Sequence, residues 1–377
     1  MTTTLKLSEN IVNLRREKKI TQEDLADFIG VTKAAVSKWE TGQSLPDILI
    51  LPQLAAYFDV TVDELLGYEA QLNREQIQKL YAGLAEDYAR LPFEEVMEKT
   101  EGLVHRYYSC YPFLLQICTL WLNHFMLAKD QEQQQEVLGK GAKLCGHVMQ
   151  NCREIAICND AMTFKALFDL QMGKASEVVE QLEGMTDPSH IWRQTDSVLA
   201  QAYLAAGEGE KACSYTQISI YMHLLFLVGA STQYLGMNMK HLGICEQTIR
   251  RTEGILCLYN LDTLHPNSAA QFYYQAALVY MTHGKKEKAL EKLGQYAQVV
   301  CFLLEEDHVC LHGDAYFDRL DEWIGKLELG AMPPRNMALV AKSVIQTLRH
   351  PLFGGLLDDE EFQRICKSIE KGVKRYE

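Results

Sequence analysis

The stretch TQEDLADFIGVTKAAVSKWETG, residues 21–42, decides how the N-terminal part of this chain folds. Thr21, followed three residues later by Asp24, has the pattern of a capping box, which begins a helix. Gly30 is expected to end that helix, because glycine readily takes the left-handed conformation found after helices. Thr32 is a suitable N-cap for a second helix over residues 33–40. The stretch therefore predicts two short helices joined by a tight turn.

The second of these helices has two different faces. At about 100° per residue, Ala35, Val36 and Trp39 point to one side, which predicts contact with a core. The opposite arc is small, polar and basic, and it consists of Lys33, Ala34, Ser37 and Lys38. Such a face suits the floor of the major groove of DNA. Gln22, in the first turn of the preceding helix, is placed to hold a phosphate.

The flanking sequence predicts further helices. A helix is expected over residues 8–18, with Ser8 as its N-cap. Pro52 removes one helical hydrogen bond, so a fourth helix should begin near it, after an irregular turn over residues 47–51.

Residues 8–66 resemble the Cro/C1-type (XRE-like) helix-turn-helix family. The matching positions are Leu14, Arg15, Thr21, Gln22, Leu25, Ala26, Gly30, Val31, Ser37, Trp39, Glu40, Gly42, Pro46, Leu54, Ala55, Val60 and Asp63-Glu64-Leu65-Leu66. The resemblance implies a five-helix DNA-binding module. Carried over by position, the resemblance implies DNA contacts by Gln22, Thr32, Lys33, Ala34, Ser37, Lys38 and Gln43. Of these, Lys33, Ala34, Ser37 and Lys38 would face bases. Gln22 and Gln43 would face phosphates. It also implies a buried ion pair between Arg15 and Glu40. A degenerate copy that binds protein is the alternative.

Charge confines any DNA contact to one surface. Residues 1–68 hold seven basic and ten acidic side chains, a net charge of −3, which leaves −10 of the total of −13 for the rest of the chain. An acidic body repels DNA, so the basic helix face must act locally. At 377 residues the chain exceeds what one core usually supports, which predicts two or more domains.

Other function classes have little support in the sequence. No apolar run reaches the ~18 residues of a membrane span, and the N-terminal residues show no signal-peptide pattern. Eleven cysteines without a CxxC pair indicate a reducing cytoplasm. Crowded thiols and imidazoles occur at Cys301, His308, Cys310 and His312 and at Cys145, His147, Cys152 and Cys158. The spacing of four between His308 and His312 could place two imidazoles on one helical face, but no second clean pair completes a metal site. We expect no metal, no cofactor and no enzyme, because catalytic and nucleotide-binding motifs are absent.

After residue 75 the chain has helical periodicity almost throughout. Pro92 is expected to separate a helix near residues 74–90 from one beginning at Phe93, and residues 114–151 to form a helix pair with a break near Lys129. Residues 201–212 and 276–293 share the spacing of an aromatic residue, then Gly, then Ala, and residues 164–182 are a looser copy. Gly173 and Gly207 are 34 residues apart, and a further pair is expected near residues 214–260.

These segments resemble tetratricopeptide (TPR) repeats, which implies an α-solenoid of antiparallel helix pairs. The predicted division is a DNA-binding domain (1–68), a linker (69–75), the solenoid (76–350) and a C-terminal helix (351–377) that either caps the last repeat or mediates dimerisation. Asn and Gln amides suit an extended peptide, because they both donate and accept hydrogen bonds. Candidate groove residues are Arg193, Gln194, Gln201, Tyr234, Asn238, His241, Gln271, Tyr274 and Gln275.

The arrangement of the whole chain resembles the Rgg/PlcR/PrgX-like peptide-responsive regulators. The resemblance implies a homodimeric cytoplasmic transcription factor that binds double-stranded DNA and a short regulatory peptide. Two alternatives stay open, namely a TPR scaffold that recruits a protein partner, and a constitutive regulator whose solenoid only dimerises.

Overall fold

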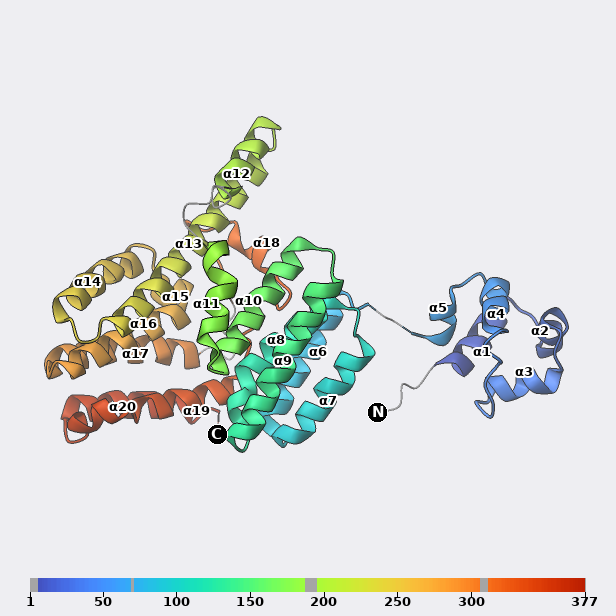
Figure 1. The fold of residues 1–377 in the computed structure, drawn as a ribbon, viewed down its shortest axis with the longest axis horizontal. Helices are drawn as coiled ribbons and strands as arrows, with labels where there is room; N and C mark the ends of the chain where they lie inside the picture. The colour runs from blue at the N-terminus through green and yellow to red at the C-terminus, as the bar shows by residue number, and fades with distance from the viewer. Residues whose placement is uncertain (1–5, 69–70, 187–194, 306–310, 377) are drawn as a thin grey trace.

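The computed structural model describes residues 6–68, 71–186, 195–305 and 311–376. Within these ranges the chain forms helices and turns, and no strand is present. The expected all-α class, with a helix-turn-helix domain before a helical C-terminal region, is therefore confirmed. Figure 1 shows a small N-terminal module set apart from a larger helical body.

Residues 6–68 form the N-terminal module, whose helices are α1 (Leu7–Glu17), α2 (Gln22–Ile29), α3 (Lys33–Glu40), α4 (Leu51–Phe58) and α5 (Val62–Leu66). The apolar faces of these amphipathic helices meet in one core. Its fully enclosed members include Ile11, Leu25, Val36, Leu54 and Leu65.

The start of α1 differs from the prediction. The helix begins at Leu7, one residue early, and Lys6 precedes it without a side-chain cap, so Ser8 is not the N-cap. Leu7 is buried in the module core. The backbone N–H of Lys6 donates to the carbonyl oxygen of Leu66 at 3.1 Å. A contact with the end of α5 therefore takes the place of a local cap.

The start of α4 is confirmed. The helix begins at Leu51 with Pro52 in its first turn, where a missing N–H costs nothing. Asp47 holds the preceding turn, because its carbonyl oxygen accepts from the N–H of Ile50 and its side chain from that of Leu49, both at 2.9 Å.

The body begins with a group of helices that has its own hydrophobic core. These helices are α6 (Arg74–Arg90), α7 (Phe93–Arg106), α8 (Tyr111–His124), the 3₁₀ turn η1 (Phe125–Leu127), α9 (Gln131–Asn151) and α10 (Ile155–Gln171). The predicted break at Pro92 and the interruption near Lys129 are both present. Phe113 and Trp121 are among the buried side chains that join this half.

A second core holds the C-terminal half of the body together. Its elements are α13 (Gly209–Met237), α14 (Leu242–Leu258), α15 (Leu261–Leu264), α16 (Pro266–Thr282), α17 (Lys286–Glu305), α18 (Leu320–Ile324), α19 (Met337–Leu348), the 3₁₀ segment η3 (Pro351–Leu356) and α20 (Glu360–Val373). Between the halves lie α11 (Ala175–Thr186) and α12 (Thr195–Ala205). No described side chain of α11 or α12 is buried, and α12 projects from the body (Figure 1).

The three predicted repeat segments share one turn geometry. Gly173, Gly207 and Gly284 each have a positive φ, between 66° and 80°, directly after a helix. In each turn the N–H of the residue after glycine donates to the carbonyl oxygen five residues earlier, at 2.9 Å. This pattern closes a helix and starts an antiparallel partner. Whether the pairs are TPR repeats stays a prediction.

The region 214–260 differs from a simple extra pair. Residues 209–237 form one continuous helix, α13, of 29 residues. This helix packs against α12, which precedes it, and against α14 and α16, which follow it. It therefore serves as the second helix of one pair and the first helix of the next.

The same helix is the one described helix that is long and apolar enough to be compared with a membrane span. By length and composition α13 could cross a membrane, with a mean hydropathy of 1.3 over its most apolar window and 22% of that window buried. Its packing against four neighbouring helices, α12, α14, α16 and α18, is that of a body helix.

The C-terminal helix covers the end of the body. Asp359 caps α20 by accepting from the N–H groups of Glu361 and Phe362. The buried face of α20 consists of Phe362, Ile365, Ile369 and Val373, and it packs against α17 and α19. Because the apolar face of α20 is buried against the body, only the polar face of this helix is left for contact with another chain.

One buried histidine ties α8 to α6. His124 is 1% exposed, and its ring stacks on Tyr88 with centroids 4.5 Å apart. Its Nδ1 lies 2.8 Å from the carbonyl oxygen of Leu120 and donates to it. Burial, helped by the positive charge of Arg335, lowers the pKa of His124 to about 4.

We predict that this half of the body loses stability in mild acid. The folded pKa of His124 lies below its unfolded value of about 6.5, so the stabilisation is complete above that pH and is lost as the pH falls toward 4. The expected loss is about 3 kcal/mol, measured by hydrogen exchange of α6 and α8. His124→Gln should remove most of this pH dependence, whereas the exposed His105→Gln should not; equal pH dependence in all three proteins would contradict the assignment.

Candidate nucleic-acid interface

Local hydrogen bonds fix the start of α2 and the turn between α2 and α3. The Thr21 hydroxyl accepts from the N–H of Asp24 at 3.1 Å, and the Asp24 carboxylate accepts from the N–H of Thr21 at 2.8 Å. The Thr21 hydroxyl also donates to Asp24 Oδ2 at 2.7 Å, and this bond, together with the bond from the backbone N–H of Thr21, lowers the pKa of Asp24. Gly30 has a φ of 76°, and the Thr32 hydroxyl accepts from the N–H of Ala35 at 3.2 Å. The caps predicted for α2 and α3 are therefore confirmed, unlike the Ser8 cap predicted for α1.

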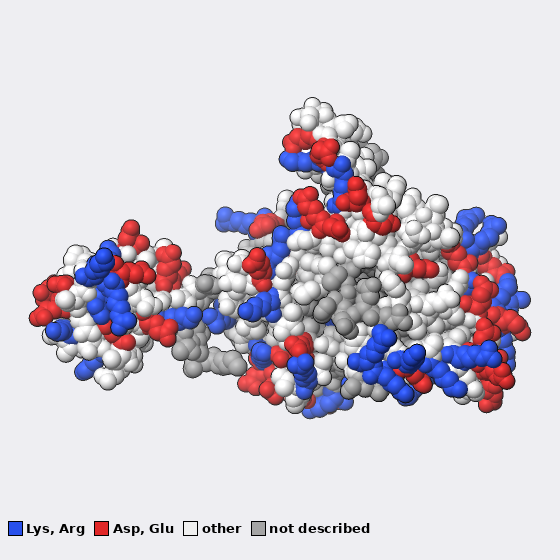
Figure 2. Space-filling view, turned by 180° about the vertical axis from the view of Figure 1, so that it is seen from behind, with Lys and Arg blue, Asp and Glu red and all other residues white. Residues whose placement is uncertain are grey.

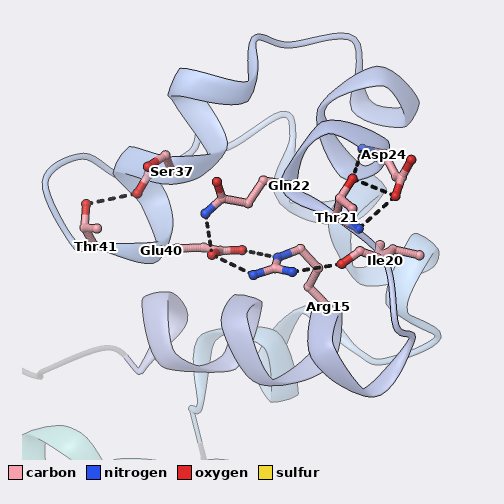
Figure 3. Close-up of polar contacts among 8 residues, drawn as sticks. All are labelled: Arg15, Ile20, Thr21, Gln22, Asp24, Ser37, Glu40 and Thr41. Carbon is pink, nitrogen blue, oxygen red and sulfur yellow. Dashed lines mark hydrogen bonds and ion pairs between the residues drawn. The ribbon is translucent and has the colours of Figure 1, made fainter.

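Arg15 and Glu40 meet at the centre of the module, as Figure 3 shows. Arg15 Nε lies 2.5 Å from Glu40 Oε1, and Arg15 Nη2 lies 3.1 Å from Glu40 Oε2. A third Arg15 nitrogen, Nη1, donates to the carbonyl oxygen of Ile20 at 2.8 Å. The two side chains are 14% and 7% exposed, so α1 and the end of α3 are joined by a bidentate, largely desolvated pair.

Gln22 completes this cluster from the start of α2. Its Nε2 donates to Glu40 Oε2 at 2.8 Å (Figure 3). Burial opposes ionisation of Glu40, but the hydrogen bonds from Arg15 and Gln22 outweigh burial and lower its pKa. Sequence reasoning assigned Gln22 to a phosphate; the structure shows that one of its amide hydrogens is already used inside the module.

The predicted reading face lies on the outer side of α3. Lys33, Ala34 and Lys38 are exposed and Ser37 is half-buried, while Val36 and Trp39 are buried against the core. Gln43 is exposed beyond the end of the helix, and Thr32 is committed to capping. The structure therefore gathers Lys33, Ala34, Ser37 and Lys38 on one surface, next to the turn that carries Gln43.

Sequence reasoning missed one contact on this surface. Lys33 Nζ lies 3.2 Å from Glu23 Oε2 across the turn, and the two side chains are 60% and 67% exposed. Exposed pairs of this kind contribute little to stability. Residues ten positions apart give no local sequence signal for the pairing. On the face of the module that Figure 2 shows, Lys and Arg are interspersed with Asp and Glu.

Known proteins match the N-terminal module. Residues 11–65 match the helix-turn-helix family HTH_3. The transcriptional repressor RstR of a Vibrio cholerae phage is 31% identical over 83 residues, which are 20% of this chain and 74% of RstR. The chain belongs to the helix-turn-helix family of transcriptional regulators.

Two further relatives of this helix-turn-helix regulator match the same part. The transcriptional activator BcrR of Enterococcus faecalis is 36% identical over 83 residues, 20% of this chain and 41% of BcrR. The uncharacterised regulator YqaE of Bacillus subtilis is 38% identical over 63 residues, 17% of this chain and 54% of YqaE. The matched part thus spans about half the length of these relatives.

One solved structure matches over most of the chain. The apo form of the competence regulator ComR from Streptococcus vestibularis is 12% identical and covers 86% of this chain and 98% of its own, with a TM-score of 0.23. A score this low carries no argument about how the helices of this regulator are arranged.

The candidate groove residues of this regulator are spread over its body. Arg193 and Gln194 lie outside the described residues. The others are Gln201 on α12, Tyr234 on α13, Asn238 and His241 between α13 and α14, and Gln271, Tyr274 and Gln275 on α16. None of these seven lines the cleft of about 550 Å³ between α12 and α13 or the cleft of about 440 Å³ formed by α14, α15, α16 and α17.

Two of the groove candidates have packing or capping roles instead. Tyr274 donates to the carbonyl oxygen of Thr347 at 3.4 Å, and its ring packs near Tyr296 and Phe353. Asn238 donates to the carbonyl oxygen of Tyr234 at 2.9 Å at the end of α13. Tyr274 therefore faces α17, α19 and η3 and not an open groove.

The larger cleft contains residues that sequence reasoning did not select. Tyr215 of α13 donates to Asp196 of α12 at 2.8 Å, beside His223. Burial and the Asp196 contact raise the pKa of Tyr215 to about 12. Of the metal candidates, His308 and Cys310 lie outside the described residues, and among the described ones no group of three His, Cys, Asp or Glu side chains could hold an ion.

We predict that Glu40→Gln loosens the module. Removing one partner of a desolvated pair leaves Arg15 buried without its counter-charge, at a cost of about 3 kcal/mol. Because the pKa of Glu40 is lowered, this contribution is present above about pH 4.3 and is lost as the pH falls through the folded pKa. Hydrogen exchange of α1 and α3 in the full chain measures it, and the exposed Glu9→Gln is the control. Unchanged exchange in Glu40→Gln would exclude this role.

Proposed function

We propose that this chain is a sequence-specific regulator of transcription that inserts α3 into the major groove of double-stranded DNA. One observation carries the proposal: the exposed face of Lys33, Ala34 and Lys38 stands on a helix that the Arg15–Glu40 pair locks to its neighbours. A rigid helix whose exposed face combines basic side chains with a small alanine can approach base edges closely. Gln22, Thr32, Ser37 and Gln43 are proposed as flanking contacts.

The charge distribution supports recognition by one end of the molecule. The whole chain carries −13 and residues 1–68 carry only −3, so DNA approaching elsewhere meets an acidic surface. We propose a cytoplasmic dimer that presents two modules to a two-fold related site, with half-sites one helical turn or a multiple apart.

We further propose that the body, residues 76–350, binds a regulatory ligand, a short peptide, and that residues 351–377 cap it. Repeated helix pairs with the same glycine turn support a solenoid-like binding surface. A ligand that prefers one arrangement of the body would shift the dimer toward or away from its DNA-competent form.

One observation favours the alternative of a scaffold for a protein partner. Large apolar side chains are exposed on α12 and α13, including Val198, Leu204, Phe226 and Met237. Exposed apolar surface of this kind is typical of protein–protein contacts. A protein that co-purifies in stoichiometric amount, together with DNA binding that short peptides do not alter, would favour the scaffold.

The decisive experiment is selection of genomic DNA fragments by the purified full-length chain. We expect fragments that share a two-fold related motif, and recovery of no common motif would overturn the proposal. The affinity for a selected fragment should fall steeply with salt, because each contacted phosphate releases counterions. A flat salt titration would contradict DNA binding.

We predict that Lys38→Ala weakens binding to the selected fragment. The exposed lysine belongs to the proposed reading face, and its removal should cost about 1–3 kcal/mol. Electrophoretic mobility shift measures the loss. Lys79→Ala, which removes an exposed lysine of α6, is the matched control, and equal affinity of both variants would exclude α3 as the reading helix.

We predict the opposite effect for Glu23→Gln. This change frees Lys33 from an exposed pair and removes a negative charge beside the reading face, so affinity for DNA should rise a few-fold. Asp27→Gln, elsewhere on α2, should change affinity less. A fall in affinity for Glu23→Gln would show that Glu23 contributes a favourable contact.

A further inference from the structure

Residues 311–336, named the clasp below, cross the body between α17 and α19 and touch both of its halves. The only regular element of the clasp is the short helix α18, which lies beside α13 (Figure 1). Phe317, Leu320 and Ile324 belong to the core of the C-terminal half, whereas Leu329 packs on the core of the first half. The clasp therefore links two cores whose intervening helices, α11 and α12, bury no described side chain.

The first anchor of the clasp is the amide of Gln217 on α13. Its Nε2 donates to the carbonyl oxygen of Tyr316 at 2.8 Å and to Asp318 Oδ1 at 2.9 Å. Its Oε1 accepts from the backbone N–H of Arg319 at 2.8 Å. One side-chain amide thus pairs with the clasp backbone in both directions, as it would with the backbone of a separate peptide.

Two side chains of the clasp occupy distinct sites around Gln217. Phe317 is 1% exposed, with its ring 5.7 Å from Tyr221 and 6.1 Å from Tyr259. Arg319 Nη1 lies 2.7 Å from Glu210 Oε2 and 3.3 Å from Ser214 Oγ on α13. The surface therefore accepts an aromatic side chain and, two residues later, a basic one.

The second anchor is on α6, in the other half of the body. Tyr81 donates to the carbonyl oxygen of Pro334 at 2.8 Å, and Gln78 Nε2 lies 3.4 Å from that of Leu327. These bonds again use the backbone of the clasp. The same segment is thus held by body side chains through its main chain at both ends.

We infer that the Gln217 surface is a binding site for a peptide that forms a turn and carries an aromatic residue and, two positions later, Arg or Lys. The clasp residues 314–320 occupy this site as an internal ligand. The inference rests on the proposed ligand control, and it assigns the ligand class and a site that includes none of the groove candidates named from the sequence.

The strengths of the contacts suit an exchangeable occupant. The Arg319–Glu210 pair is weak, because Glu210 is 87% exposed. The main stabilising term is the burial of Phe317, which a ligand with its own aromatic residue reproduces. Because the clasp is part of the same chain, it competes for the site at a high effective concentration. A free peptide must therefore bind the site more tightly than the clasp does, or be present at a comparably high concentration. Displacement would free the two halves to reorient and so change the spacing of the DNA-binding modules.

The test uses a labelled synthetic peptide of residues 314–321, DAYFDRLD, and fluorescence anisotropy with the full-length chain. Phe317→Ala in the protein should raise the affinity for this peptide about tenfold or more relative to the native chain, because the internal ligand is weakened while its site is intact. Adding Gln217→Ala should abolish the gain. Phe226→Ala, which removes an exposed phenylalanine of α13, and a scrambled peptide are the matched controls.

Hydrogen exchange of residues 313–321 reports whether the clasp has been released. Release without peptide binding would overturn the inference, as would binding that survives Gln217→Ala. If Phe317→Ala fails to fold, Arg319→Ala is the second variant, because it leaves the core intact. Arg319→Ala should raise the affinity for the peptide a few-fold. If hydrogen exchange shows that the clasp is released and the affinity does not rise, the inference is again overturned.

DNA binding is measured separately on the selected fragment. Peptide binding that leaves DNA affinity unchanged would support the site and remove ligand control from the proposed function. If the chain proves not to bind DNA, the anisotropy measurement still tests the peptide site.

Discussion

The desolvated pair between Arg15 and Glu40 sets the geometry on which the N-terminal module depends. Arg15 comes from α1, Glu40 from the last residue of α3 and Gln22 from the first residue of α2, so one polar cluster fixes the relative positions of three helices. Apolar packing is non-directional and would tolerate small rotations of α3. A bidentate pair does not, because its two parallel hydrogen bonds define a plane. The outward direction of Lys33 and Lys38 follows from this constraint.

The body follows a different principle. Its helices are held mainly by apolar contacts, and polar side chains of α6 and α13 are used to bind the main chain of the clasp. Backbone groups are the one feature that any peptide shares, which is why a surface built to hold them can exchange one segment for another. Hydrogen bonds between side chains therefore fix the orientation of α3 in the module, whereas hydrogen bonds from side chains to the main chain allow one peptide segment to replace another in the body.

The sequence predicts features whose causes are local. The caps at Thr21 and Thr32, the turn at Gly30 and the helix boundaries at Pro52 and Pro92 depend on residues three or four positions apart, and all are present. The outward face of α3 follows from helical periodicity alone.

Features that depend on distant residues were not predictable in this way. The start of α1 depends on Leu66, the engagement of Gln22 on Glu40 and the packing of Tyr274 on α19. The clasp is the largest omission, because its anchors lie 99 to 253 residues away in the chain.

The separation of the hydrophobic core into three clusters has a consequence for denaturation. Separate clusters can melt as separate cooperative units, so we expect the chain to unfold in more than one step and damage to the module to leave the body folded.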